Sequence, residues 1–314
     1  MFTPRITWTD LPEPVRSEVE TAMGSPVVEW RGQTGGFSPG TADRLLLADG
    51  RKVFCKSVSA SLNGGSHELV RRELTANRLL PDGLPSPRLL HGAELTVDDD
   101  PWAVLLFDDL EGRHPHTPWR VDELAAALEA LAAVPRVAPV APPSLPGVEE
   151  LFGPDLTHWD DVIADPPATL DPWLAARLDD LAVRGHRARA ALAGESLSHL
   201  DSRADNMILD ADGRVWLVDW PYACRGAAWV DTAVFAATAA IAGGWSSEHQ
   251  TLVDEASAAL GCDPDLLTDV WAGFLGYYVW VSEKPAPANL PTIRAFQANC
   301  RDRLLESVKA RLRD

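Results

Sequence analysis

The stretch SHLDSRADNMILDADGRVWLVDW, residues 198–220, places Asp201, Asn206 and Asp219 between apolar runs that are typical of buried strands. An Asp-Gly turn separates two of these runs, which predicts a hairpin of Met207–Leu209 with Val215–Val218. The three polar residues either form ordinary turns between strands or bind a divalent cation and a phosphate. Features elsewhere in the chain decide between these alternatives.

The rest of the chain divides into a β-rich N-terminal third and a helical remainder. The first part is expected to contain a helix from an Asp10 cap to Gly24, a strand at 26–30, a glycine-rich turn at 31–42, two strands within 43–58, a helix at 66–81, a turn-rich stretch at 82–95 and a strand at 102–110. The second part is expected to contain a helix at 121–134, a proline-rich connector at 135–147, a long helix at 171–193 and helices from about 229 onward. This order predicts an α+β, two-lobed fold with a ligand cleft between the lobes.

Composition limits the classes of partner. The 314 residues carry a formal charge of -18, which argues against nucleic acid or an anionic membrane as a partner. No apolar run is long enough to span a bilayer and no signal peptide is visible. The four scattered cysteines fit free thiols, so we expect a cytoplasmic protein.

Lys56 lies inside the strand segment KVFCKSV, where a charged side chain normally needs a partner. Glu73, on the following helix, is a candidate for that partner. A lysine–glutamate pair beside a glycine-rich turn can bind phosphates, while Asn206 and Asp219 offer the oxygen ligands that magnesium prefers. Asp201 would then orient an attacking hydroxyl and accept its proton.

At this point a resemblance emerges. HLDSRADN (199–206) resembles the H-x-D-x-x-x-x-N catalytic loop of the protein-kinase-like fold, in particular that of the aminoglycoside phosphotransferase family. VDW (218–220) lies where that family has its metal-binding aspartate. GGFSPGTADRLLLADGRKVFCK (35–56) and VDWPYACRGAAWVDTA (218–233) look like the uncharacterised phosphotransferase-like members of the family.

The resemblance implies three regions and a role for each matching residue. Residues 1–107 would form an N-terminal nucleotide-binding lobe, 108–113 a hinge, and 114–314 a helical C-terminal lobe with the catalytic loop and the acceptor site. Asp201 would be the catalytic base, Asn206 and Asp219 the Mg²⁺ ligands, Lys56 the contact to the α- and β-phosphates of ATP or GTP, and Glu73 its ion-pair partner. The backbone of Gly35, Gly36, Phe37 and Ser38 would cover the phosphates, the backbone of Asp108 and Leu110 would bind adenine, and Asp231 would support the catalytic loop.

The sequence departs from the family at two places in the loop. The family commonly has glycine at position 200 and an apolar residue at 202, and this chain has Leu200 and Ser202. Arg203 occupies a place where kinases often have a basic residue facing the γ-phosphate. It either stabilises the charge of the transferring phosphoryl group or pairs with Asp205.

The expected activity is phosphoryl transfer to a hydroxyl of a small molecule. Residues 149–180 carry nine acidic residues against one arginine, so they form either a solvated acidic face or a surface that attracts cations. The second alternative favours a cationic, antibiotic-like acceptor such as an aminoglycoside, and Trp159 and Trp173 in this stretch are candidates for stacking on it. The alternatives are a kinase for a macrolide, a choline-like or homoserine-like metabolite or a sugar, a non-catalytic nucleotide-binding module, and a protein kinase. No A-P-E segment follows Asp219, which argues against the last.

Overall fold

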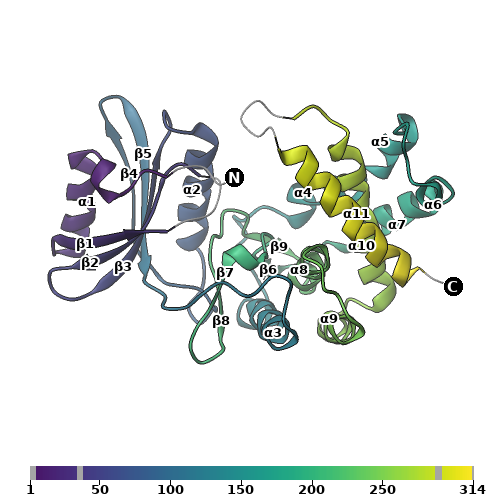
Figure 1. Ribbon diagram of the computed structural model, residues 1–314. Coiled ribbons are helices and arrows are strands. Elements are labelled where there is room, and N and C mark those ends of the chain that lie inside the picture. Colours follow the sequence, from purple (N-terminus) through teal and green to yellow (C-terminus); the bar gives the residue numbers. More distant parts are fainter. Residues whose placement is uncertain (1–4, 34–37, 287–291, 313–314) are drawn as a thin grey trace. The chain divides into compact units, whose positions relative to one another are not determined.

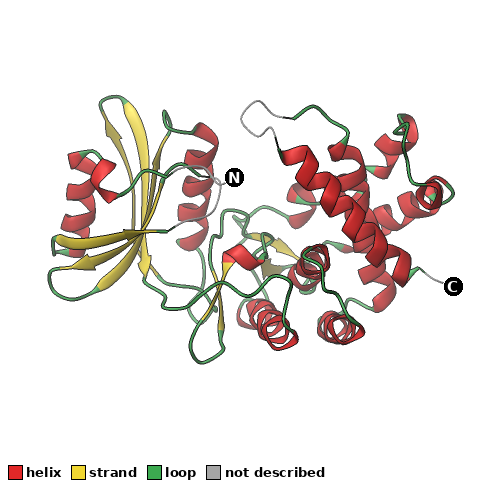
Figure 2. Cartoon of the chain, in the orientation of Figure 1, coloured by secondary structure: helices red, strands yellow, loops and turns green. Residues whose placement is uncertain are grey.

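The structure is a computed structural model that describes residues 5–33, 38–286 and 292–312. The chain forms two compact units (Figures 1 and 2). The first unit runs to Arg113 and also includes residues 208–222, and the second contains residues 114–207 and the chain from Ala223 onward. The architecture is α+β, with an antiparallel sheet in the first unit and mostly helices in the second.

A five-stranded antiparallel sheet forms the centre of the first unit. Its strand order is β1-β2-β3-β5-β4. The strands are β1 (Val27–Gly32), β2 (Thr41–Leu47), β3 (Lys52–Ser59), β4 (Leu89–Val97) and β5 (Asp100–Asp108). Central β3 and β5 pair along almost their whole length, from Val53 opposite Asp108 to Ser59 opposite Trp102.

Both faces of this sheet are covered, which explains the long apolar runs in β3 and β5 (Figure 2). The helix α1 (Glu13–Met23) buries Val15 and Val19 with Leu45 and Cys55 on one face. The helix α2 (Gly64–Asn77) buries Val70 and Leu74 with alternate residues of β3 and β5 on the other face. Lys56 is carried by β3 and Glu73 by α2, so the packing of α2 on the sheet fixes their separation.

The hairpin of β7 (Met207–Leu209) and β8 (Val215–Leu217) has the predicted Asp-Gly turn. Arg113 and Leu209 exchange backbone hydrogen bonds of 3.1 and 2.7 Å, and the Leu217 N–H donates to Pro85 O at 2.7 Å. These bonds group residues 208–222 with the sheet unit. A Cβ on Gly112 would lie 2.5 Å from Leu209 O, so only glycine permits this approach.

The second unit is built around α10 (Pro264–Ser282), which packs against α7, α8 and α11. Its helices are α3 (Val121–Val137), α4 (Val148–Leu151), α5 (Trp159–Ala164), α6 (Pro172–Ala175), α7 (Leu178–Ala191), α8 (Val230–Ile241), α9 (Ser247–Ala259), α10 and α11 (Ile293–Arg311), and short 3₁₀ turns include η2 (Pro154–Leu156) and η3 (Ala204–Asn206). Two short strands, β6 (Ser196–Ser198) and β9 (Cys224–Gly226), pair antiparallel. Gly185 on α7 faces Gly273 on α10, and the missing side chains let these helices pack closely.

Several predicted boundaries were wrong. The first helix begins at Glu13 rather than after Asp10, because the Asp10 carboxylate accepts hydrogen bonds from Thr7 and ends a separate 3₁₀ turn at residues 8–10. The expected helix at 171–193 is two helices, α6 and α7, because the backbone leaves the helical conformation at Arg177. The stretch at 82–95, for which turns are predicted, instead contains the first part of strand β4. Gly92 lies in this strand, where a Cβ would come within 2.1 Å of the Leu74 side chain, so this glycine accommodates helix α2 rather than forming a turn.

The structure also bears on the expectations for the cysteines and for membrane-spanning segments. All four cysteines are buried free thiols. Among the helices in the described ranges, none combines the length and the apolarity that crossing a bilayer requires.

Candidate active site

Lys56 is bonded to two carboxylates in the first unit. Its Nζ donates to Glu73 Oε2 at 2.6 Å and to Asp219 Oδ1 at 2.8 Å. Only 19% of the Lys56 side chain and 3% of the Glu73 side chain are exposed. The lysine–glutamate pair expected from the sequence is therefore present, and Asp219 joins it from the end of the hairpin β7–β8.

Burial and charge act in opposite directions on this cluster. Burial alone would lower the pKa of Lys56, but the negative charges of Asp219 and Glu73 outweigh it, so the pKa lies above its usual value. Burial raises the pKa of Glu73, and the positive charge of Lys56 opposes this. Removing the lysine would leave a buried carboxylate without its cation, so the three groups depend on one another.

Asp219 adopts a left-handed backbone conformation, with φ of 68°. Aspartate tolerates this region better than most residues because its short side chain can bond to nearby groups. The side chain is 39% exposed, although Lys56 holds one of its oxygens.

The catalytic-loop motif lies in the second unit, between β6 and β7. Asp231, in the first turn of α8, is buried, and its two carboxylate oxygens accept the N–H groups of His199 and Leu200 at 2.7 and 2.8 Å. Burial raises the pKa of Asp231, and the two backbone hydrogen bonds counter that effect. Thr238, about two helical turns further along α8, donates to Ser202 O at 3.2 Å. Residues in the first and last turns of α8 therefore hold the loop.

Leu200 has φ of 66°, a conformation that glycine adopts without strain and leucine does not. This geometry explains why a glycine suits position 200 in the family. The Leu200 backbone keeps the same turn here because Asp231 binds its N–H.

Asp201 and Asn206 are in direct contact. Asn206 Nδ2 donates to Asp201 O at 2.9 Å and to Asp201 Oδ2 at 2.8 Å. The amide nitrogen thus faces Asp201, and the amide oxygen, the atom that could bind a hard cation, points away from it. Asp201 remains 25% exposed.

Arg203 forms the pairing that the sequence left as its alternative. Its Nε and Nη2 donate to Asp205 at 3.1 and 3.0 Å, and its Nε lies 3.7 Å from Asp201 Oδ1. Burial raises the pKa of the Tyr278 hydroxyl on α10, and the nearby positive charge of Arg203 opposes the shift. Arg203 is therefore close both to the loop carboxylates and to α10.

Of the glycine-rich segment, Gly35, Gly36 and Phe37 lie outside the described residues. Ser38 is described, and its hydroxyl accepts from Gly40 N at 3.3 Å. At the other end of the sheet, Asp108 ends β5 and its N–H donates to Arg88 O at 3.1 Å, while Leu110 follows in the linker and is half-buried.

The acidic stretch is partly neutralised in the second unit. Six of its carboxylates have basic partners, which are Glu149 with Arg189, Asp155 and Asp161 with His158, Asp160 with His186, Asp180 with Arg184 and Asp171 with Lys309. Trp159 cannot stack on a ligand, because it is fully buried and its Nε1 donates to Ala272 O at 2.7 Å. Trp173 stacks instead with Arg177, whose guanidinium carbon lies 4.6 Å from the ring centroid.

Three features of the two units were not foreseen. In the first unit, Arg5 Nη1 donates to Gly40 O at 3.2 Å; burial lowers the pKa of Arg5, and the charge of Asp219 opposes the shift. In the second unit, burial raises the pKa of Asp155 to about 6 although His158 lies nearby. The His158 ring stacks on Trp280 at 4.0 Å. The only sequence signal was the acidic stretch around Asp155.

A family profile now identifies the class of protein. The profile of the phosphotransferase enzyme family matches residues 37–274, which is more than half of the chain, so the chain belongs to this family. It is therefore a phosphotransferase, and the family acts on hydroxyl groups of small molecules. No curated protein sequence matches it.

Solved structures show the same fold at low sequence identity. An aminoglycoside phosphotransferase from Alicyclobacillus acidocaldarius is 16% identical, with a TM-score of 0.55 over 90% of this chain and 92% of the other. The amicoumacin kinase hAmiN, in complex with AMP-PNP, Ca²⁺ and Ami, is 12% identical, with a TM-score of 0.57 over 97% and 95%. Choline kinase LicA from Streptococcus pneumoniae is 13% identical, with a TM-score of 0.54 over 95% and 99%. The kinase-like aminoglycoside phosphotransferase fold is thereby established.

Proposed function

We propose that the protein transfers the γ-phosphoryl group of ATP or GTP to a hydroxyl of a cationic, antibiotic-like small molecule. The observation that carries this proposal is the partly buried Lys56, bonded to both Glu73 and Asp219. Holding a cation largely out of water between two carboxylates costs desolvation energy, so it needs a reason beyond stability. Binding the α- and β-phosphates of a nucleotide supplies one, because Lys56 can exchange Asp219 for a phosphate oxygen while Glu73 continues to hold it.

The remaining roles follow from the chemistry of transfer. The acceptor oxygen attacks the γ-phosphorus, the bond from that phosphorus to the β–γ bridging oxygen breaks, and the nucleoside diphosphate leaves. Asp201 orients the acceptor hydroxyl and takes its proton, and Asn206 fixes the Asp201 carboxylate through Nδ2. Arg203, 3.7 Å from Asp201, is proposed to stabilise the charge of the transferring group, for which it must leave Asp205.

Mg²⁺ is the cofactor that this chemistry calls for, since it neutralises charge on the phosphates when it is bound. The described residues contain no group of three or more His, Cys, Asp or Glu side chains suited to a metal. Asn206 in the second unit and Asp219 in the first each remain a candidate ligand, because magnesium is commonly bound by one or two protein oxygens together with substrate phosphates and water. Each can offer an oxygen, since Asn206 uses its nitrogen on Asp201 and Lys56 occupies only one Asp219 oxygen.

The base is proposed to bind along the linker after β5. Asp108 would contribute its carbonyl, because its N–H already donates to Arg88 O, and Leu110 would contribute its N–H. Ser38, with Gly35, Gly36 and Phe37, is proposed to cover the phosphates.

A cationic acceptor is favoured by Asp155 together with the stacked rings of His158 and Trp280 in the second unit. A carboxylate beside an aromatic surface is a common way to bind an ammonium or guanidinium group. Replacement by asparagine, Asp155→Asn, should raise KM for cationic acceptors several-fold and leave KM for neutral acceptors unchanged.

The test is nucleotide turnover with Mg²⁺ over a panel of cationic antibiotics, macrolides, amino alcohols and sugars. Wild type, Asp201→Ala and the control Asp212→Ala, in the exposed turn of the hairpin, are compared. We expect one acceptor class to stimulate release of nucleoside diphosphate in wild type and control, and not in Asp201→Ala. Arg203→Ala at an unchanged rate would refute the role of Arg203 alone. Absence of nucleotide binding to the wild type would refute the whole proposal.

A further inference from the structure

A second cationic side chain, that of Arg44, lies on the same face of the sheet as Lys56. In the pairing of β2 with β3, Ala42 lies opposite Lys56 and Arg44 lies opposite Phe54. Opposed residues in an antiparallel pair point to one face, and so do residues two apart along a strand. Arg44 and Phe54 therefore share the face of Lys56 and lie about 7 Å along the strands from it.

Arg44 is held by the linker that follows β5. Its Nε donates to Asp109 Oδ1 at 2.7 Å and its Nη2 donates to Asp109 Oδ2 at 2.6 Å. This two-pronged arrangement fixes the plane of the guanidinium group. The Asp109 side chain is 3% exposed and that of Arg44 is 27% exposed, so the pair differs from the neighbouring Lys52–Glu111 pair, in which both side chains are well exposed.

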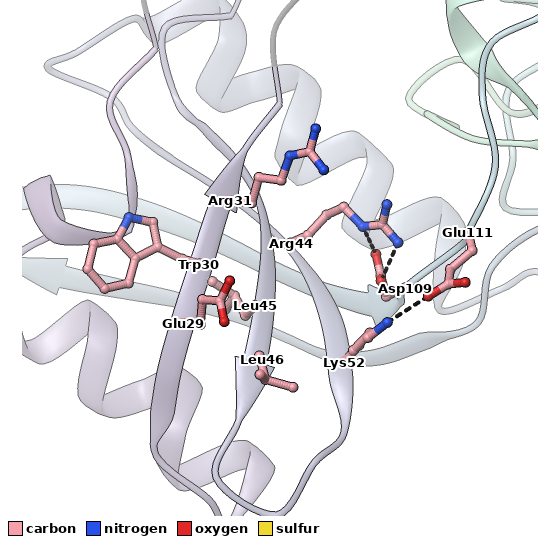
Figure 3. A pocket seen from close by; sticks show the side chains of 9 residues that line it. All are labelled: Glu29, Trp30, Arg31, Arg44, Leu45, Leu46, Lys52, Asp109 and Glu111. Carbon is pink, nitrogen blue, oxygen red and sulfur yellow. Dashed lines mark hydrogen bonds and ion pairs between the residues drawn. The ribbon is translucent and has the colours of Figure 1, made fainter.

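A cavity of about 450 Å³ lies over this pair in the first unit. Its lining comes from β1, β2, the start of β3 and the linker, and Figure 3 shows Arg44 reaching from β2 to Asp109 in that linker. Arg31 lies opposite Arg44 in the register of β1 with β2 and lines the same cavity. The volume suits a small planar ligand, and the lining combines the apolar Trp30, Leu45 and Leu46 with charged side chains.

We propose that the guanidinium plane of Arg44, fixed by Asp109, is the surface on which the base of the bound nucleotide stacks. This inference rests on the proposed function, because it assumes that a nucleotide binds with its phosphates at Lys56. A planar cation stacks well on an aromatic base, and a lysine at the same place would not. Arg44 is thus a residue that contacts the base, and Asp109 is a positioning residue that acts through Arg44.

Stacking recognises the ring system and not its substituents, so ATP and GTP should depend on Arg44 to the same extent. Inorganic tripolyphosphate has no base and should not depend on it. This difference separates stacking from simple charge, because loss of a cation near the phosphates would weaken both kinds of ligand.

The experiment measures binding of ATP, GTP and tripolyphosphate, each with Mg²⁺, to the full-length chain by calorimetry. The variants are Arg44→Ala, Arg44→Lys and Asp109→Asn. Arg51→Ala is the matched control, because Arg51 is an exposed arginine of the same sheet unit that pairs with Asp49. We expect Arg44→Ala and Arg44→Lys to weaken both nucleotides about tenfold or more, with tripolyphosphate and the control unchanged within about twofold. Asp109→Asn should cause a smaller loss for the nucleotides only.

Loss of the ion pair could also disturb the fold, so a double variant is included. Arg44→Met with Asp109→Leu replaces the pair by apolar side chains, which is often tolerated for buried pairs, and it should still lose the preference for nucleotides. Equal weakening of ATP and tripolyphosphate would overturn the inference, as would unchanged ATP binding in the Arg44 variants. If wild type itself fails to bind ATP and GTP, the proposed function fails with it.

Discussion

Replacing Asp231 with asparagine tests how the loop at residues 199–206, which is proposed to be catalytic, is held. Both oxygens of the buried Asp231 carboxylate accept backbone hydrogen bonds, from His199 at 2.7 Å and Leu200 at 2.8 Å. Asparagine has the same shape but offers one oxygen and one NH₂ group. One of the two backbone N–H groups therefore loses its acceptor and meets another donor.

The expected loss of stability follows from these two bonds. A hydrogen bond to a charged group contributes about 1.5–3 kcal/mol, and a buried donor left without an acceptor costs about 1–3 kcal/mol. Burial raises the pKa of Asp231, which shows that the ionised carboxylate is itself costly in this position, and the neutral amide avoids that cost. The net destabilisation by Asp231→Asn should therefore be about 2 kcal/mol.

The assay is urea unfolding followed by tryptophan fluorescence, with Asp212→Asn in the exposed hairpin turn as the control. We expect a lower unfolding midpoint for Asp231→Asn than for wild type, and an unchanged midpoint for the control. Phosphoryl transfer should fall more than stability alone explains, because Asp201 follows directly after Leu200. An Asp231→Asn protein with wild-type stability and wild-type turnover would refute the view that these hydrogen bonds position the loop.

Substitutions at three further sites test backbone strain at Leu200, a buried carboxyl group at Asp43 and close packing at Gly40. Leu200→Gly should be about 1 kcal/mol more stable than Leu200→Ala in urea unfolding, because only glycine relieves the left-handed conformation. Burial raises the pKa of the Asp43 carboxyl group from 3.8 to about 6. The folded state therefore keeps the carboxyl proton to higher pH than the unfolded state does. The protonated carboxyl group contributes its full stability below pH 3.8, and this stability is lost as the pH rises to about 6. The loss amounts to about 3 kcal/mol, so Asp43→Asn should have a higher unfolding midpoint than wild type at pH 8 and little advantage at pH 4. Gly40→Ala should destabilise the protein by about 1–3 kcal/mol, because the added Cβ would lie 2.4 Å from Ser57 O. Gly64→Ala is the control, because its Cβ would have no atom within 4 Å, and its thermal midpoint should not fall.

Local patterns predicted much of the fold because the physical causes are local. The hairpin at 207–217 follows from an Asp-Gly turn between apolar runs, and α2 follows from its helical period. Lys56 and Glu73 could be matched because a charge inside a strand needs a partner on the element that covers it. Strand β4 could not be recognised, because Gly92 serves a contact with Leu74 that the sequence does not reveal.

Sequence patterns could not predict contacts between segments that are distant along the chain. Arg44 and Asp109 are 65 positions apart, and nothing near either residue indicates that they meet. Trp159 lies in an acidic stretch that suggests exposure, yet its neighbours on α10 bury it completely. Charge composition describes the average surroundings of a segment, whereas burial depends on the elements that pack against each residue.

Backbone strain distinguishes the proposed site from the other turns. Among the described residues other than glycine, positive φ occurs at Asp98, Asp99, Leu200 and Asp219. The first two form the two-residue turn between β4 and β5, where the hairpin itself requires this conformation. Leu200 and Asp219 belong to the catalytic-loop and metal-aspartate motifs, and side-chain hydrogen bonds secure each position, through Asp231 at one and Lys56 at the other. Strained backbone conformations persist only where surrounding contacts hold them in place. The chain therefore accepts a loss of stability at the two places where the direction of a carboxylate matters most to the proposed transfer.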